Sequence, residues 1–148
     1  MKIRAATPSD LEPLAELRAE LVRETFTRPY EPAAWSERKK IFERALGEGL
    51  LFVAEDGEEL VGFTVGEILR PGIGGIVFLH VRPHARRRGV AQRLTAELAA
   101  ALAAKGAVWV HVEVEDDNAG ARAVYERWGF APCASLLIAE VEELRRAL

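Results

Sequence analysis

The sequence has a single cysteine, Cys133, among 148 residues. One thiol cannot form an intramolecular disulfide or supply the several thiolates of a cysteine zinc site. No apolar run approaches the roughly 20 residues of a membrane-spanning helix. Met1 leads directly into a strand pattern, without the apolar core of a signal peptide. These absences predict a cytoplasmic protein that does not enter the membrane.

The sequence also lacks a strong excess of positive or negative charge, because the net charge is only -3. Such a balance gives no general attraction to nucleic acid, and we expect no nucleic-acid partner. The three histidines, His80, His84 and His111, do not have the spacing of metal ligands, so no metal is expected. Hydrophobic residues make up 49% and charged residues 29%, as in ordinary globular proteins. The length predicts one domain, residues 1–148.

Hydrophobic spacing and turn residues predict an α/β fold. The first helix has a capping pattern, Thr7-Pro8-Ser9-Asp10, and is interrupted at residues 29–32 by two prolines. The expected order is β-α-α-β-β-β-α-β-α-β, followed by a short helix. Strands are predicted at 2–6, 50–55, 60–69, 76–81, 108–114 and within 130–141, and helices from 7, at 33–46, 89–105, 118–128 and 142–148.

A basic loop, Arg86 to Gln92, lies between the apolar strand that ends at Val81 and an amphipathic helix. The first amides of a helix have no intrahelical acceptor and lie at the positive end of its dipole, which favours phosphate binding. Gly89 allows a phosphate to approach the backbone. The loop has neither the Gly-Lys-Ser/Thr of a P-loop nor a three-glycine dinucleotide fingerprint. The alternative is a solvated, basic helix start.

Two motifs in the second half of the chain resemble those of the GNAT family of N-acetyltransferases. Leu79-His80-Val81-Arg82-Pro83, followed by Arg86-Arg87-Arg88-Gly89-Val90-Ala91, is similar to its central motif. A second motif is matched by Val112-Glu113-Val114, Asn118, Ala121, Tyr125 and Gly129-Phe130. The motifs occur in the family's order and spacing, and the resemblance extends over nearly the whole chain.

The resemblance implies a mixed central sheet that is splayed between its fourth and fifth strands, with flanking helices. Acetyl-CoA would lie in the gap, its pantetheine along the fourth strand and its pyrophosphate on the loop amides. Asn118 would touch the pantetheine arm, although it could equally be a plain helix N-cap. The residues expected to contact the coenzyme are Leu79, His80, Val81, Arg86, Arg87, Arg88, Gly89, Val90, Ala91, Gln92 and Asn118.

Two residues are candidates for proton transfer. Tyr125 matches the family's tyrosine beside the sulfur of coenzyme A, where a phenol can protonate the departing thiolate; the alternative is a core tyrosine. Glu113 is the candidate base, acting through water, and the alternative is an outward-facing strand glutamate. The central strand has no carboxylate over residues 75–78, which leaves His80, His111 and Glu67 as further candidates.

The implied function is transfer of acetyl from acetyl-CoA to a primary amine by direct attack, with a small-molecule amine preferred. An acidic run, Glu115-Asp116-Asp117, could attract such a cation. A protein N-terminus or lysine is an alternative acceptor, and a non-catalytic CoA-binding sensor is an alternative function. Family members often dimerise, so a homodimer is an expectation. Cys133 in the short tail is expected to be a buried filler.

Overall fold

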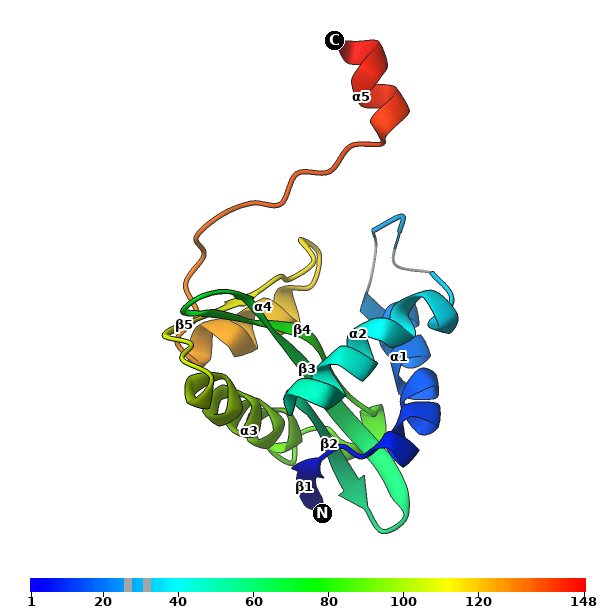
Figure 1. The fold of residues 1–148 in the computed structure, drawn as a ribbon, viewed down its shortest axis with the longest axis vertical. Coiled ribbons are helices and arrows are strands. Elements are labelled where there is room, and N and C mark those ends of the chain that lie inside the picture. The colour runs from blue at the N-terminus through cyan, green and yellow to red at the C-terminus, as the bar shows by residue number, and fades with distance from the viewer. Residues whose placement is uncertain (26–27, 31–32) are drawn as a thin grey trace. The chain divides into compact units, whose positions relative to one another are not determined.

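The structure is a computed structural model that describes residues 1–25, 28–30 and 33–148 (Figure 1). Part of the predicted break at residues 29–32 therefore lies outside the described residues. The chain forms two compact units, Met1–Glu115 and Asp116–Leu148. The elements are β1 Lys2–Ala5, a 3-10 turn Pro8–Asp10, α1 Leu11–Thr25, α2 Trp35–Glu48, β2 Leu51–Asp56, β3 Glu59–Arg70, β4 Ile73–Val81, a 3-10 turn Pro83–Ala85, α3 Val90–Ala104, β5 Trp109–Val112, α4 Ala119–Arg127 and α5 Val141–Ala147.

One mixed sheet of the first unit holds all the strands of the described residues, in the order β1-β2-β3-β4-β5. Neighbouring strands are antiparallel except β4 and β5, which are parallel. The parallel pair is connected through α3, as a crossover between parallel strands requires. The expected α/β fold with a mixed sheet and flanking helices is confirmed.

The two faces of the sheet have different chemistry. On one face, Phe42 of α2 packs on Phe63 of β3 and Phe78 of β4, with ring centroids 5.6 Å apart in both pairs. On the other face, leucines of α3 lie over glycines of β3 and β4. Because successive strand residues point to opposite faces, the two neighbours Gly62 and Phe63 serve different layers.

Glycine on this second face lets α3 approach the sheet closely. A Cβ added at Gly66 would collide with the side chain of Leu98, and one at Gly74 would come within 2.8 Å of Leu102. Both leucines are fully buried, so neither has room to move away. The position of α3, and with it the position of its N-terminus, therefore depends on having glycine, which has no side chain, at these two positions.

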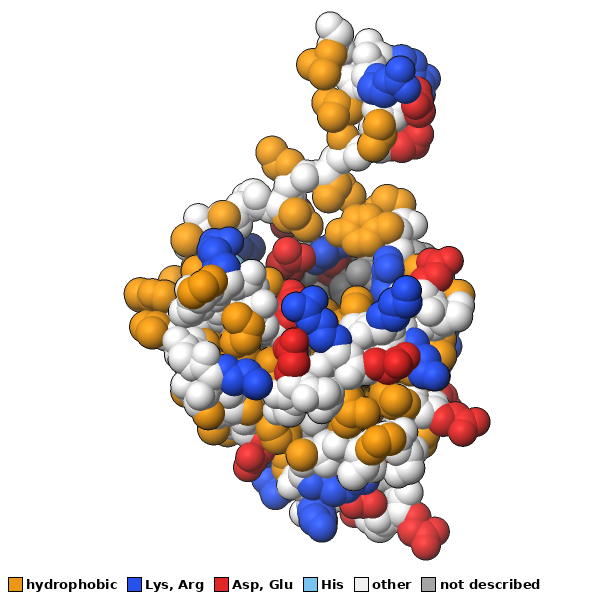
Figure 2. Space-filling view, in the orientation of Figure 1, with side chains coloured by type: hydrophobic (Ala, Val, Ile, Leu, Met, Phe, Trp, Pro, Cys, Tyr) orange, Lys and Arg blue, Asp and Glu red, His pale blue; other side chains and the backbone are white. Residues whose placement is uncertain are grey.

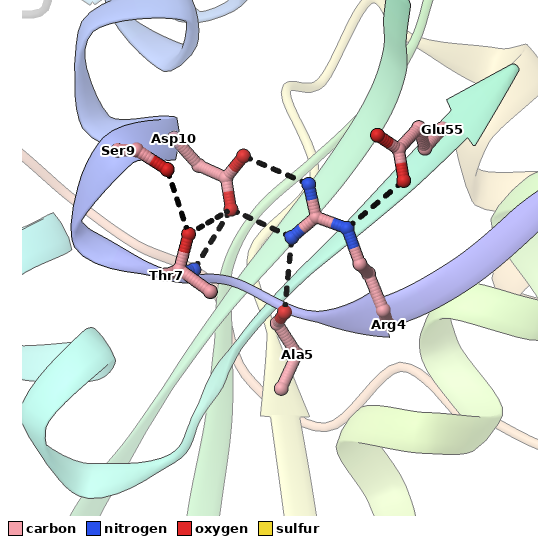
Figure 3. A network of polar contacts seen from close by, with 6 residues as sticks. All are labelled: Arg4, Ala5, Thr7, Ser9, Asp10 and Glu55. Carbon is pink, nitrogen blue, oxygen red and sulfur yellow. Dashed lines mark hydrogen bonds and ion pairs between the residues drawn. The ribbon is translucent and has the colours of Figure 1, made fainter. Parts of the chain in front are cut away.

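A partly buried ion pair fixes the start of the chain (Figure 3). Arg4 of β1 donates two hydrogen bonds to Asp10, at 2.7 and 2.9 Å, and a third to Glu55 of β2. The Asp10 carboxylate also accepts the backbone N–H of Thr7 at 2.7 Å, as the predicted capping pattern requires. The hydrogen bonds from Arg4 lower the pKa of Asp10. The entry into α1 is thereby bound to the edge of the sheet.

A second polar contact joins α1 to the end of β4. His80 is 4% exposed, and its Nε2 lies 3.1 Å from a carboxylate oxygen of Glu20 on α1. Burial lowers the pKa of His80, while the hydrogen bond with Glu20 and the nearby charge of Glu24 oppose that shift. The imidazole is therefore neutral at physiological pH.

The second unit differs from the sequence prediction. Residues 130–140 form no strand, so the strand expected within 130–141 is wrong. Apolar residues identify a segment that can form a strand, but a strand exists only where another backbone pairs with it. Cys133 is exposed, which also corrects the expectation of a buried filler. Among the described residues, no helix is long and apolar enough to cross a membrane.

The close packing of α3 can be tested with Gly66→Ala. We expect this substitution to lower the free energy of unfolding by about 1–3 kcal/mol, because the new methyl group overpacks Leu98. The matched control is Gly47→Ala in α2, where a Cβ meets nothing within 4 Å and should stabilise the helix by about 0.5–1 kcal/mol. Urea unfolding of both variants measures the difference, and equal effects would contradict the packing argument.

The buried His80 predicts a pH dependence of stability. Its folded pKa lies below the ordinary value, so as pH falls the unfolded chain binds the proton first and unfolding is favoured. The stabilisation is complete above about pH 7.5 and decreases as the pH falls through the ordinary histidine pKa of about 6.5. We therefore expect the wild-type protein to lose stability relative to His80→Gln between about pH 7.5 and pH 5, by at most about 1.4 kcal/mol per pH unit. Parallel stability curves for the two proteins would show that His80 is not responsible.

Candidate functional site

The sheet opens along the outer side of β4. Pairing between β4 and β5 covers only four residue pairs and ends at Ile76 and Val112. Val77, the next residue, is also skipped in the register with β3, where Val65 pairs with Phe78 and Gly66 with Ile76. Such a bulge bends a strand and re-aims the residues after it. From residue 77 to residue 81, β4 has no strand partner on its β5 side among the described residues. The expected splay between the fourth and fifth strands is thus confirmed.

This open strand edge contains Leu79, His80 and Val81, which were predicted to bind the pantetheine. Each remains paired with β3 on the other side, which holds the strand in place, while no strand of the described residues pairs with its outer side. On that outer side the Val81 carbonyl accepts a hydrogen bond from Arg86. An extended ligand can add to such an edge as another strand. The His80 side chain does not contribute there, because it is buried against Phe63 and Glu20.

The predicted phosphate loop follows this strand and ends at α3. Gly89 is the N-cap residue in a left-handed conformation, with φ 75° and ψ 13°, and Arg87 is also left-handed at φ 62°. The cap makes no side-chain hydrogen bond, and within the described part of the chain the amides of residues 87–92 donate to no protein acceptor. Free amides at a helix N-terminus form an anion site. The predicted residues Val90, Ala91 and Gln92 supply the first of these helical amides.

The three arginines of the loop have different partners. Arg86 donates from Nε to the Val81 carbonyl at 2.8 Å and forms an ion pair with Glu24 of α1. Arg88 lies 3.2 Å from Asp56 in an exposed ion pair. Arg87 has no ion-pair partner among the described residues and is exposed. Arg86 therefore joins the loop to β4 and α1, while Arg87 leaves its charge available for an anion.

Glu113 lies directly after β5, one residue past the last pair with β4. Its side chain is 61% exposed. Arg28, in the segment between α1 and α2, donates to Glu113 at 2.7 Å and also lies 2.7 Å from Glu115. Sequence reasoning missed Arg28, because 85 residues separate it from Glu113 and no local pattern connects them.

The other two strand candidates for the base share one row of the sheet. Gly75 pairs with Glu67 of β3 on one side and with His111 of β5 on the other. Residues in one row point to the same face. Gly75 itself has no side chain there, and the side chain of Leu69 lies 3.4 Å from where its Cβ would stand. Glu113 is two residues from His111 and belongs to the same face by alternation. This face is the one that α3 does not cover, since α3 lies over Gly74.

The second unit carries Asn118 and Tyr125. Asn118 is the N-cap of α4, and its side-chain oxygen accepts the amide of Ala121 at 3.1 Å. Tyr125 packs edge-on against Trp128 and Phe130, at centroid distances of 5.7 and 5.5 Å. Burial raises the pKa of Tyr125 to about 12. The phenol therefore keeps its proton throughout the neutral range.

In the part of the chain that the structure describes, no three side chains of His, Cys, Asp or Glu gather in a group that could hold a metal ion. The exposed Cys133 stands in a segment without regular structure. The arrangement therefore offers backbone amides, a strand edge and proton-carrying side chains.

Known structures share this fold. A ribosomal-protein-alanine N-acetyltransferase from Brucella melitensis superposes with a TM-score of 0.76 and 25% identity, over 90% of this chain and 86% of that one. AAC(6')-Iy, in complex with the bisubstrate analogue CoA-S-monomethyl-acetylneamine, gives a TM-score of 0.74 and 21% identity, over 94% and 96% of the two chains. At this identity the second likeness shows the fold alone.

Sequence relatives agree with the fold. Over 81 residues, the chain is 40% identical to mycothiol acetyltransferase from Streptomyces avermitilis; the match covers 54% of this chain and 26% of that relative. The chain thus spans about a quarter of the curated relative. The profile of the acetyltransferase (GNAT) family matches residues 15–130, which include the open strand, the loop and both motifs. Because this match covers most of the chain, the protein belongs to the acetyltransferase (GNAT) family.

Proposed function

We propose that the protein is an N-acetyltransferase that moves the acetyl group of acetyl-CoA to the primary amine of a small molecule. The observation that carries this proposal is that two consecutive stretches of backbone have groups open to a ligand. An open strand edge at residues 77–81 leads directly into a loop whose amides at 87–92 have no acceptor among the described residues. Membership of the acetyltransferase (GNAT) family and the CoA-containing analogue in the AAC(6')-Iy complex both support an acyl-CoA as the common ligand of these surfaces.

The residues present fit the two ends of that ligand. A pyrophosphate needs several N–H donors and positive charge, and the loop provides the amides at Gly89 to Gln92 together with Arg87. The amide bonds of pantetheine need an extended partner, and β4 provides one at Leu79 to Val81. Bound acetyl-CoA would supply a thioester whose acetyl group an amine can accept.

Proton transfers are assigned to Tyr125 and Glu113. Tyr125 holds a proton on its phenol oxygen at neutral pH and can donate it to a departing thiolate. Glu113 accepts the proton that the amine loses, through water, after its hydrogen bond from Arg28 is released. Glu67 and His111 are the alternatives on the same face of the sheet. In the bound complex, a backbone amide of the open strand stabilises negative charge on the thioester oxygen. Asn118 is proposed to contact the pantetheine arm.

The negative charge near the site supports a cationic amine as the acceptor of the acetyl group. Glu113 and Glu115 form a carboxylate pair that already holds one cation, the guanidinium of Arg28. A cationic amine matches that preference. The relatives are named as an aminoglycoside N-acetyltransferase, a mycothiol acetyltransferase and a ribosomal-protein-alanine N-acetyltransferase. A protein N-terminus or a lysine side chain is therefore the alternative acceptor. No observation on this chain favours a sensor without catalysis.

Thiol release tests the function directly. The protein is incubated with acetyl-CoA and a panel of polyamines, aminoglycosides, amino-acid amides and short peptides. We expect release of coenzyme A with at least one primary amine of the small-molecule group and none with matched alcohols. Binding of CoA is measured in parallel by calorimetry. Tight binding without turnover on any amine would replace the proposal with the sensor function, and turnover only on peptides would move the acceptor to proteins.

Substitution of the two proton carriers tests the mechanism. Tyr125→Phe keeps the ring packing and removes the phenol proton, so we expect kcat to fall by about 100-fold with KM for acetyl-CoA nearly unchanged. Glu113→Gln should lower kcat by a similar factor, because an amide cannot accept the proton of the amine. Glu48→Gln on α2 is the control. A Glu113→Gln enzyme with the wild-type kcat would transfer the base role to Glu67 or His111.

A further inference from the structure

Arg28 binds the candidate base from a distant part of the chain. Its Nη1 donates a hydrogen bond to Glu113 at 2.7 Å and another to the hydroxyl of Tyr30 at 3.2 Å. Its Nε lies 2.7 Å from a carboxylate oxygen of Glu115. The side chain of Arg28 is 14% exposed and that of Glu115 is 8% exposed, so most of this ion pair is shielded from water. Opposite charges that are shielded from water attract each other more strongly than charges on the open surface.

The same contact interferes with the role proposed for Glu113. Its oxygen Oε2 accepts the hydrogen bond from Arg28, so this oxygen cannot take up the proton of an amine until the bond is released. An arriving ammonium group also meets the permanent positive charge of the guanidinium, and like charges repel each other. Arg28 and a cationic acceptor therefore compete for the same carboxylates.

The group that displaces Arg28 has to be a cation. Glu113 is 61% exposed, so a molecule from solution can reach it. On the face that Figure 2 draws, the described acidic and basic side chains are intermixed, so no broad area of one sign selects a ligand there. Local contacts decide instead, because two carboxylates that bind one guanidinium also match an ammonium or guanidinium group of a ligand. A neutral molecule lacks that match and leaves Arg28 in place.

We propose that Arg28 is a specificity-determining residue that competes with the acceptor. Its guanidinium holds Glu113 and Glu115 in the resting protein, and only a cationic acceptor displaces it and frees the base. This inference rests on the proposed function and adds the step that selects the acceptor. Displacement requires only that the Arg28 side chain turn away, which its rotatable bonds allow. Because only the protein molecules with Arg28 displaced can bind the acceptor, the apparent affinity for the amine is reduced by their fraction.

Binding of methylguanidinium gives the first test, because this probe carries the same group as Arg28 and needs no turnover. Arg28→Gln removes the internal competitor, so it should bind methylguanidinium about tenfold more tightly than the wild-type protein does, as measured by NMR titration. Arg44→Gln is the matched control, because it removes an arginine from an exposed ion pair with Glu48 on α2. Equal affinity in Arg28→Gln and the wild-type protein would overturn the proposal, and so would an equal gain in Arg44→Gln.

The wild-type protein provides a second test, which does not depend on the folding of a variant. The Nε–H signal of Arg28 is followed by NMR while methylguanidinium is added. We expect this signal to shift until binding saturates, because the glutamate oxygens that Arg28 binds are taken over by the probe. Methylurea, which is neutral and has a similar shape, should leave the signal unchanged. A signal that responds to neither probe, or to both equally, would overturn the displacement of Arg28.

Turnover separates this inference from the proposed function. In Arg28→Gln we expect KM for the amine to fall about tenfold, while KM for acetyl-CoA keeps its wild-type value. Arg28→Lys restores a positive charge and should return KM for the amine toward the wild-type value. A higher KM for the amine in Arg28→Gln would overturn the inference, because Arg28 would then support acceptor binding. If no amine is acetylated by any of these proteins, the proposed function fails, while the methylguanidinium titrations still decide whether Arg28 competes with cations.

Discussion

The loss of pairing between β4 and β5 after Ile76 is the constraint on which the rest of the site depends. A parallel pair that continued to Val81 would have satisfied the backbone of β4 on both sides and left nothing for a ligand. The skipped residue Val77 marks the point where the strand changes course. Beyond it, one edge of β4 belongs to the sheet and the other is open. Every group of the first unit that is proposed to bind acetyl-CoA lies at that open edge or directly after it.

The open edge is held in place by packing and by charge together. Leucines of α3 lie over Gly62, Gly66 and Gly74, and this close contact fixes where the N-terminus of α3 presents its free amides. On the opposite side, α1 contributes two carboxylates one turn apart, Glu20 to His80 and Glu24 to Arg86. Arg86 also binds the carbonyl of Val81, the last residue of the strand. The end of β4, the loop and α1 therefore form one connected structure.

This connection changes the roles of the arginines. A run of three basic residues before a helix suggests three charges around a phosphate, but a guanidinium binds whichever carboxylate or carbonyl the fold brings within reach. Arg86 has two such partners and Arg88 has one, while Arg87 has none among the described residues. Arg28 shows the same principle at the other end of the site, where it holds Glu113 and Glu115 together. Charge near a site is thus shared between binding a ligand and holding the loops that surround it.

Local periodicity, caps and turn residues were enough to predict the α/β class, nearly every helix and strand, and the loop from Arg86 to Gln92, because these features depend on neighbouring residues along the chain. The sequence also determined the family, since the two motifs stand in fixed order along the chain. Contacts between distant residues could not be predicted in this way, because they depend on how the whole chain folds. Glu113 is exposed and bound by Arg28, His80 is buried beside Glu20, and Val77 is skipped in the register with β3. Only the tertiary structure decided that residues 130–140 form no strand and that Cys133 is exposed, since strand formation and burial both require a partner surface from elsewhere in the fold.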